Sequence, residues 1–370
     1  MLREPSIAPS HTRLLSLDFM RGLIMILLAL ESTGLYEHIA DASGESWLHR
    51  LMLQFFHHPW NGLRFWDLVQ PAFMFMAGTA MAYSLSKQQL QGLTWNQSFR
   101  KILKRCGWLF FWGVLDYAVG KTGLSFKLWD VLTQLSFTTL VAFLIHRWPV
   151  AWQIIVCVGL LLLTEILYRC TNIPGFNQPF TDQHNFGNYM DLVLMNLINK
   201  DGWVAINCIP TSVHTIAGVL AGRLLLSPGT GKLRIMLSWG FITLLAGLAL
   251  DLSGITPIIK RIATSSFTLA SLGWCLFGLS LFYWWIDVRA HRRYLLFFLV
   301  VGMNSLFIYL FFEIVGSRWF NEYIGAITGG LLKMINVPET ATLIIGSLCI
   351  FMLEWSLCYF LYRKKIFFRI

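Results

Sequence analysis

The sequence predicts an all-α, polytopic membrane protein with about ten transmembrane helices. Of its 370 residues, 56% are hydrophobic and only 13% are charged, whereas a soluble domain carries about 25% charged residues. The apolar residues form long runs, and about 20 residues at ~1.5 Å rise each cross the hydrocarbon core of a bilayer. The net charge of +10 does not indicate nucleic acid as a partner, because the basic residues stand at the ends of these runs.

The expected spans follow one another with short connections, and no repeat or low-complexity tract separates them. They run near 15–35, 64–86, 104–120, 128–146, 149–168, 203–226, 233–252, 264–286, 294–316 and 340–362. The amphipathic stretch 319–337 is expected to be an interfacial helix or a short, re-entrant eleventh element. Residues 1–13 are polar and form an expected N-terminal tail, and 14–370 form a single transmembrane domain.

Lysine and arginine are distributed unevenly between the two sides of the expected bundle. If the N-terminus is cytoplasmic, 18 of the 29 basic residues lie inside and 10 lie outside, and the remaining one, Arg21, lies within the first span. Cytoplasmic loops carry the excess of Lys and Arg, so both termini are expected in the cytoplasm. The first apolar run contains Asp18 and continues to Leu30 without a small-residue cleavage site, so no cleavable signal peptide is expected.

The stretch 55–77 combines polar and apolar residues in an unusual way. His57 and His58 precede a Trp-Asn-Gly turn, and Asp67 stands about one helical turn inside the second expected span. An ionisable group at that depth costs roughly 2.5–3.5 kcal/mol on insertion scales, so it faces protein or water rather than lipid. The alternative is an interfacial anchor, because His, Trp and Arg are common at headgroup level.

Other polar residues within the spans allow structural as well as functional interpretations. The intramembrane acids include Glu31, Asp116, Glu165 and Glu354, and some of them are expected to form interhelical hydrogen bonds. Asp18 and Arg21 share a helix face and form either a structural ion pair or a ligand contact. Gly218 and Gly222 form a GxxxG pattern, for which close helix packing is favoured over a binding role. The seven cysteines are scattered without a CxxC, which argues against a metal site.

In order along the chain, these motifs resemble those of the transmembrane acyltransferases related to heparan-α-glucosaminide N-acetyltransferase. The matching residues are Arg13, Ser16, Asp18, Arg21 and Gly22; His57, Trp60, Asn61, Gly62, Asp67, Leu68, Val69 and Pro71; Pro210, Gly218, Ala221 and Gly222; Pro257, Lys260, Thr264 and Ser266; Gly302 to Ser305; and Leu361 to Ile370. The resemblance is to a bacterial-type member, expected in a bacterial inner membrane and expected to lack the large luminal N-terminal region of the family. It also has Glu31 where the family places an asparagine, and only Asp201-Gly202-Trp203 where the family has D-P-E-G.

The resemblance implies acyl transfer from acetyl-coenzyme A, with His57 at the position of the catalytic histidine. Asp67 is the expected orienting carboxylate, Asn61 a candidate oxyanion donor, and Glu31 an acceptor contact in the same outer cavity. The residues expected to bind coenzyme A are Arg21, Lys260, Ser266 and Asn304. For the contacts with its phosphates, the sequence does not choose among Arg21, Lys104, Arg105 and Lys260. The expected acceptor is an amine or hydroxyl, as in an amino sugar or glycan, and the other partner is the lipid bilayer. A homodimer is left open, and no metal is expected.

Two other functions are compatible with the residues alone. Ten spans, buried acids and prolines at 71 and 210 suit a proton- or cation-coupled transporter of small molecules. No inverted repeat is visible, however, and the His-Trp-Asn-Gly motif has no obvious role in transport. A non-catalytic membrane scaffold is the third hypothesis. Binding of coenzyme A would separate the first function from the other two.

Overall fold

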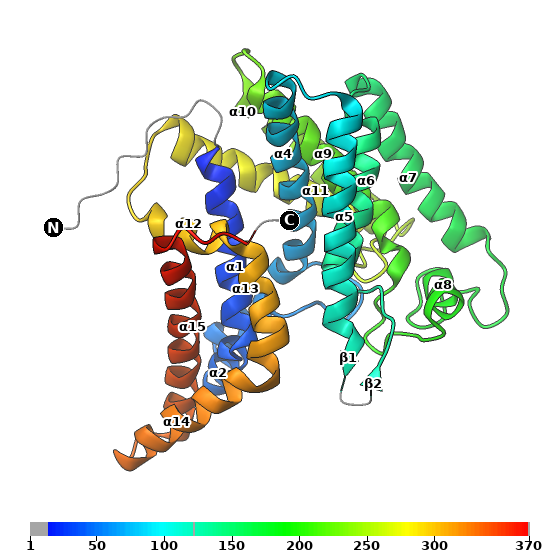
Figure 1. Cartoon of the computed structure of the whole chain (residues 1–370). Helices are drawn as coiled ribbons and strands as arrows, with labels where there is room; N and C mark the ends of the chain where they lie inside the picture. The colour runs from blue at the N-terminus through cyan, green and yellow to red at the C-terminus, as the bar shows by residue number, and fades with distance from the viewer. Residues whose placement is uncertain (1–13, 121–122, 369–370) are drawn as a thin grey trace.

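The computed structural model describes residues 14–120 and 123–368 as a bundle of helices with one short β-hairpin (Figure 1). The all-α prediction is confirmed for these residues, and the expected N-terminal tail 1–13 lies outside them. The helices are α1 (Leu15–Ser32), α2 (Leu35–Ala42), α3 (Trp47–Met52), α4 (Val69–Leu90), α5 (Trp95–Ala118), α6 (Val131–Ile145), α7 (Val150–Cys170), α8 (Phe186–Met195), α9 (Cys208–Leu226), α10 (Lys232–Leu252), α11 (Ser265–Phe282), α12 (Leu295–Met303), α13 (Ser305–Phe311), α14 (Asn321–Met334) and α15 (Glu339–Arg363).

Shorter elements connect these helices. The hairpin pairs β1 (Val119–Gly120) with antiparallel β2 (Gly123–Leu124). The 3₁₀ turns are η1 (Leu53–Phe55), η2 (Phe65–Leu68) and η3 (Ala205–Asn207), and the wider π-helical stretches are η4 (Tyr283–Val288) and η5 (Phe312–Phe320). In Figure 1, α1, α2 and α12 to α15 occupy one side of the molecule and α4 to α10 occupy the other, and α11 runs from the second group toward α1.

Within the described residues, six helices are long and apolar enough to cross a membrane, and a seventh crossing is added if one bent pair counts as a span. The expected number of ten is therefore not reproduced. The six are Phe65–Leu90, Val150–Cys170, Ala205–Leu226, Lys232–Leu252, Ser265–Val288 and Glu339–Arg363. Each of them coincides with an expected span. The chain is thus a multi-pass membrane protein by the length and composition of its helices.

The other expected spans do not meet this criterion of length and apolar composition, and the reason can be identified for each. Helix α1 has only 18 residues and contains Asp18, Arg21 and Glu31. Helix α5 has basic residues over its first half, and α6 has only 15 residues. Each is too charged or too short to count as a crossing by itself. All three nevertheless pack within the bundle, where protein rather than lipid surrounds part of their surface.

The expected span 294–316 is broken. Helix α12 ends at Met303, and a single helix runs from Ser305 to Met334 at 72° to it. Asn304 stands at the break, where its Nδ2 donates to the carbonyl of Ile366 at 3.2 Å and its Oδ1 accepts from the N–H of Phe368 at 3.0 Å. The side chain therefore holds the C-terminal segment against the break. The separate element expected at 319–337 is the end of this second helix.

Glycines determine the closest helix contacts. A Cβ at Gly78 of α4 would lie 2.0 Å from the carbonyl oxygen of Thr215, and one at Gly218 of α9 would lie 2.0 Å from that of Phe75. The two backbones thus approach to a distance that only glycine permits, as small residues allow in membrane bundles. The packing role predicted for Gly218 is confirmed. This contact fixes α4, the helix that follows the His57 loop.

Candidate active site

The loop that precedes α4 carries the two histidines, and the backbone holds it in place from both sides. The N–H groups of Arg64 and His58 donate to Asp67 Oδ2 at 2.9 and 3.3 Å. On the other side, the N–H of Gly62 donates to the carbonyl of Ile258 at 2.8 Å. Gly62 has φ +140°, and a Cβ there would lie 2.6 Å from the His58 ring. The position therefore requires glycine.

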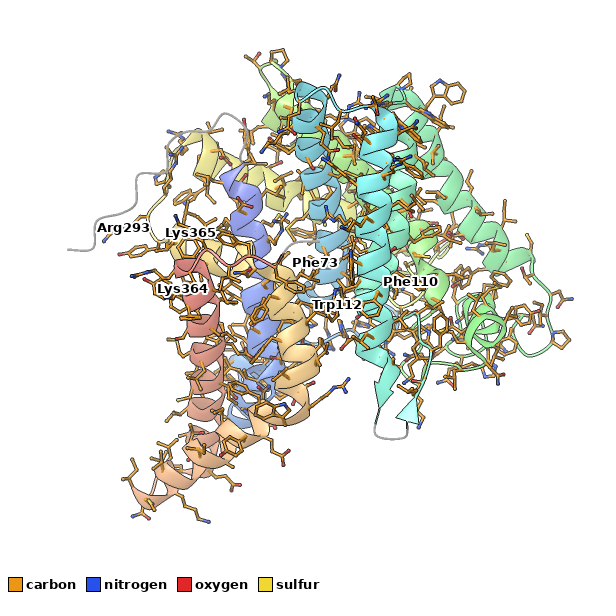
Figure 2. The ribbon with its side chains drawn as sticks, in the orientation of Figure 1. Phe73, Phe110, Trp112, Arg293, Lys364 and Lys365 are labelled. Carbon is orange, nitrogen blue, oxygen red and sulfur yellow. The ribbon has the colours of Figure 1, made fainter. Side chains whose placement is uncertain are left out.

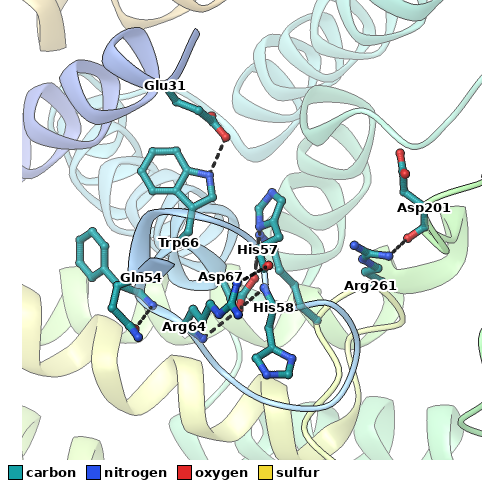
Figure 3. Close-up of polar contacts among 11 residues, drawn as sticks. Glu31, Gln54, His57, His58, Arg64, Trp66, Asp67, Asp201 and Arg261 are labelled. Atoms are coloured by element: carbon teal, nitrogen blue, oxygen red, sulfur yellow. Dashed lines mark hydrogen bonds and ion pairs between the residues drawn. The ribbon is translucent and has the colours of Figure 1, made fainter. Parts of the chain in front are cut away.

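Three ionisable side chains meet at this loop. His57 Nδ1 lies 3.2 Å from Asp67 Oδ1 (Figure 3). Lys260 Nζ lies 2.9 Å from His57 Nδ1 and 3.7 Å from the same carboxylate oxygen. Asp67 is fully buried and Lys260 is 5% exposed, whereas the side chain of His57 is 37% exposed. The imidazole is thus the accessible member of a buried charge cluster.

Lys260 reaches the cluster from the loop between α10 and α11, about 200 residues further along the chain. The hydroxyls of Thr264 and Ser266 both donate to the carbonyl of Pro257, at 2.7 and 2.8 Å. The backbone of Ile259 pairs with that of Asn61 in an antiparallel bridge. The two loops are therefore fastened to each other, which sets the position of Lys260 relative to His57.

Trp203 completes the wall around the cluster. Its ring meets the His57 ring edge-to-face, with centroids 5.7 Å apart and planes at 77°. Lys260 Nζ lies 5.2 Å from the centre of the Trp203 ring, within cation–π range. Arg261 donates to the carbonyl of Asp201, which ties the Trp203 segment to the Lys260 loop (Figure 3). Sequence reasoning did not name Trp203 as a site residue, although it lies in the segment Asp201–Trp203 where the chain departs from the family motif.

Burial and charge shift the proton affinities of the two basic groups. Burial lowers the pKa of Lys260 to about 8, although the carboxylates of Asp67 and Glu31 oppose the shift. Burial and then the positive charge of Lys260 lower the pKa of His57, although the hydrogen bond to Asp67 opposes them. At neutral pH the imidazole is therefore uncharged beside an ammonium group.

The neutral imidazole has two arrangements in this cluster. If Lys260 donates to Nδ1, the ring proton is on Nε2, and no lone pair is available at the exposed nitrogen. If Nδ1–H donates to Asp67, the lone pair of Nε2 is free to accept a proton. Asp67 Oδ1 accepts from Nδ1–H in the second arrangement, and Lys260 Nζ, 3.7 Å from the same oxygen, then pairs with this carboxylate by charge. The cluster can thus present a general base at Nε2.

Glu31 joins this site through Trp66. The indole Nε1–H of Trp66 donates to Glu31 Oε1 at 2.9 Å, and Trp66 directly precedes Asp67 (Figure 3). The Glu31 residue is exposed, whereas Trp66 is 1% exposed. Glu31 also interacts electrostatically with Lys260. The structure therefore brings Glu31 to the same neighbourhood as His57.

Two adjoining cavities, of about 460 and 570 Å³, lie along α4 toward its C-terminal end. Both are lined by Ser84, Arg105 and Phe368. The first cavity also has Arg21, which pairs with Asp18 at 3.7 Å, and the second also has Lys101 and Lys104. Phe73 of the first cavity and Trp112 of the second lie in Figure 2 between the two sides of the bundle.

The structure separates the predicted site residues into three groups. His57, Asp67 and Lys260 meet directly, and Asn61 and Glu31 lie beside them, Asn61 exposed on the same loop. Ser266 holds the Lys260 loop, and Asn304 holds the C-terminal segment that carries Phe368. Arg21 lies apart from them, in the cavity wall. Whether each residue performs its predicted role stays a prediction.

Comparison with known proteins gives one match of relevance. The chain is 24% identical over 426 residues to heparan-alpha-glucosaminide N-acetyltransferase of Homo sapiens. This chain is a distant homologue of that enzyme. The match covers 97% of this chain but 60% of the human protein, so the chain spans about three fifths of its relative's length. No family model matches the chain.

Proposed function

We propose that this protein is a membrane-embedded acyltransferase that moves an acetyl group from coenzyme A to an acceptor amine or hydroxyl. The observation that carries the proposal is the contact of His57 Nδ1 with Asp67, because donation of Nδ1–H to this carboxylate leaves the lone pair of Nε2 free to act as a general base. The distant similarity to an N-acetyltransferase supports the reaction type and an amino-sugar or glycan acceptor. The protein's position in a bacterial inner membrane, with both termini cytoplasmic, belongs to the same proposal.

In the proposed reaction, His57 Nε2 accepts the proton of the acceptor as its nitrogen or oxygen attacks the thioester carbonyl. The tetrahedral oxyanion then collapses, the C–S bond breaks, and the proton passes from His57 to the leaving thiolate. General base catalysis typically contributes ~10²–10⁴-fold. Asp67 stabilises the imidazolium that forms between the two steps, as carboxylates do in other triads. Asn61 and the backbone beside it are the proposed oxyanion donors.

The two basic cavities are the proposed site of the donor. Coenzyme A is polyanionic, and Arg21, Lys101, Lys104 and Arg105 place four cationic groups around the cavities. The first cavity follows α4 from Ser84 to Phe73, and Asp67 lies six residues before Phe73, about 9 Å at ~1.5 Å per residue. A donor with its phosphates at the basic end would thus direct its thioester toward His57, while the acceptor approaches from the opposite side.

The test is acetyl transfer by the purified protein, measured as release of free thiol and as acetylated product by mass spectrometry. We expect His57→Ala to lower the rate by about 100-fold or more, and His58→Ala to have a much smaller effect. Coenzyme A at ~100 times its dissociation constant should stabilise the parent and both variants by ~2.7 kcal/mol. Equal losses from both substitutions, or full activity of His57→Ala, would refute the assignment. Solute uptake into proteoliposomes without acetyl transfer would favour the transporter.

A further inference from the structure

A buried carboxyl group on α15 has no hydrogen-bond partner among the described residues. Glu354 of α15 is 1% exposed, and neither of its carboxylate oxygens has a hydrogen-bond partner among the described residues. None of the ion pairs in the described part of the chain includes it. The residue lies nine positions before Arg363, about 14 Å along the helix. Such a group in a membrane span normally pairs with another group or contacts a functional ion.

The nearest helix contributes a second orphaned oxygen. Asn321 Oδ1 is buried without a hydrogen-bond partner in the described structure. The orientation of this amide is not arbitrary, because its Nδ2 donates to the carbonyl of Ser32 at 2.8 Å. A flipped amide would place two oxygens against each other there. Asn321 therefore presents an acceptor, and not a donor, on its other side.

Gly316 connects these oxygens. A methyl group on Gly316 would lie 3.3 Å from Asn321 Oδ1 and 3.5 Å from Glu354 Oε1, so both oxygens border the same small space. Gly316 belongs to the π-helical stretch Phe312–Phe320, where the N–H of Asn321 bonds back to the carbonyl of Gly316. Single π turns inside helices are often found at functional sites. This one widens the helix opposite the carboxyl group.

The local electrostatics favour a positive charge. The site holds a carboxylate and an amide oxygen, both of which are acceptors. The carbonyl of Ser32, which belongs to the last turn of α1, adds the negative end of a helix dipole nearby. Oxygen ligands select hard cations, and a single carboxylate matches a single positive charge. No group of three or more His, Cys, Asp or Glu side chains among the described residues could hold a metal ion, so a transition metal is not indicated.

We propose that Glu354, Asn321 and the space above Gly316 form a binding site for an alkali cation between α15 and the helix from Ser305 to Met334. Transport proteins bind sodium similarly, with oxygens beside irregular helix turns at membrane depth. The bound cation would balance the buried carboxylate and fasten α15 to the π-helical stretch and, through Asn321, to the end of α1. This site is independent of the proposed acyl transfer.

The experiment measures thermal unfolding of the purified full-length protein in choline chloride, with sodium or potassium chloride replacing it at constant ionic strength. We expect a saturable rise in Tm of about 2–4 °C with at least one of the two ions. Glu354→Gln should abolish the rise, whereas Glu339→Gln, on the exposed first turn of the same helix, should retain it. Binding of radioactive sodium should show about one ion per chain in the parent if sodium is the effective ion.

A second variant keeps the test decisive if Glu354→Gln does not fold. Gly316→Ala removes no polar group but places a methyl between the two oxygens, so it should lower the apparent cation affinity by about tenfold or more. A Tm that is the same in choline, sodium and potassium would overturn the proposal. So would a cation response that survives in both Glu354→Gln and Gly316→Ala. In either case the carboxyl group is held as a neutral acid, and the acyl-transfer proposal is unaffected.

Discussion

Replacing Lys260 by methionine tests whether its charge controls the base strength of His57. Lys260 Nζ lies 2.9 Å from His57 Nδ1, and its positive charge contributes to the lowered pKa of the imidazole. Methionine retains an unbranched side chain of similar length and removes the charge. Because the ammonium disfavours the imidazolium, its loss must raise the pKa of His57. The direction of the effect is therefore fixed by the geometry.

The size of the expected rise in the pKa of His57 follows from the distance between Lys260 Nζ and the imidazole and from the exposure of the His57 side chain. Two unit charges about 4 Å apart interact with ~1 kcal/mol in water and ~4 kcal/mol at an effective dielectric constant of 20. The side chain of His57 is 37% exposed, so solvent screens the interaction and the lower part of this range applies. A value of about 1–2 kcal/mol corresponds to about one pKa unit. We expect the pKa of His57 to rise by that amount.

The assay is the pH dependence of kcat/KM for acetyl transfer, whose acidic limb reports the base in the free enzyme. In the parent the midpoint of this acidic limb should lie below pH 6.5. In Lys260→Met the midpoint should move to higher pH by about one unit. Lys200→Met, which alters an exposed lysine, is the matched control. An acidic limb that stays in place, or moves to lower pH, would refute the argument.

Three further substitutions test the surroundings of the site. Asp67→Asn should keep the fold but lower kcat by about 100-fold or more, because an amide cannot stabilise the imidazolium. An unchanged pH–rate profile would make Asp67 structural. Glu31→Asn should raise KM for a cationic acceptor by about 1.5- to 5-fold, because an exposed ion pair contributes ~0.2–1 kcal/mol. A change confined to the affinity for coenzyme A would contradict this prediction. Gly78→Ala should destabilise by about 1–3 kcal/mol in thermal unfolding, because its Cβ would lie 2.0 Å from a carbonyl oxygen of α9. Gly107→Ala is the control and should not destabilise the protein, because a Cβ at Gly107 would have no other atom within 4 Å.

The sequence predicted that His57, Asp67 and Lys260 are site residues, but it did not predict which of them contact one another. His57 and Asp67 are ten residues apart, and a turn followed by a helix start brings them together, which local reasoning can anticipate. Lys260 was expected at the phosphates of coenzyme A, and the structure places it at the imidazole. That contact depends on the pairing of Asn61 with Ile259 between two distant loops. No periodicity or composition signal reports such a pairing.

The number of membrane spans shows a different limit. Apolar length predicts a crossing well where a helix is uniformly hydrophobic, as in 149–168 and 340–362. Helices α1 and α5, in the expected spans 15–35 and 104–120, carry too many charged residues to be identified as crossings in this way. Apolar length also fails at Asn304, where one side chain bonds the distant C-terminal segment and the helix turns by 72°. The break depends on a tertiary contact, and the apolar pattern continues through it.

Helix α4 joins the parts of the proposed mechanism. Its 3₁₀ entry carries Asp67, its middle lines the first cavity from Phe73 to Ser84, and Gly78 fixes it against α9. A shift of α4 would therefore change the His57 contact and the shape of the cavity at the same time. Because the Gly78 contact with α9 leaves no room for such a shift, α4 holds the proposed donor cavity and the proposed base His57 at a fixed spacing. The same argument implies that a substitution at Gly78 alters activity from within the bundle, without contact with either substrate.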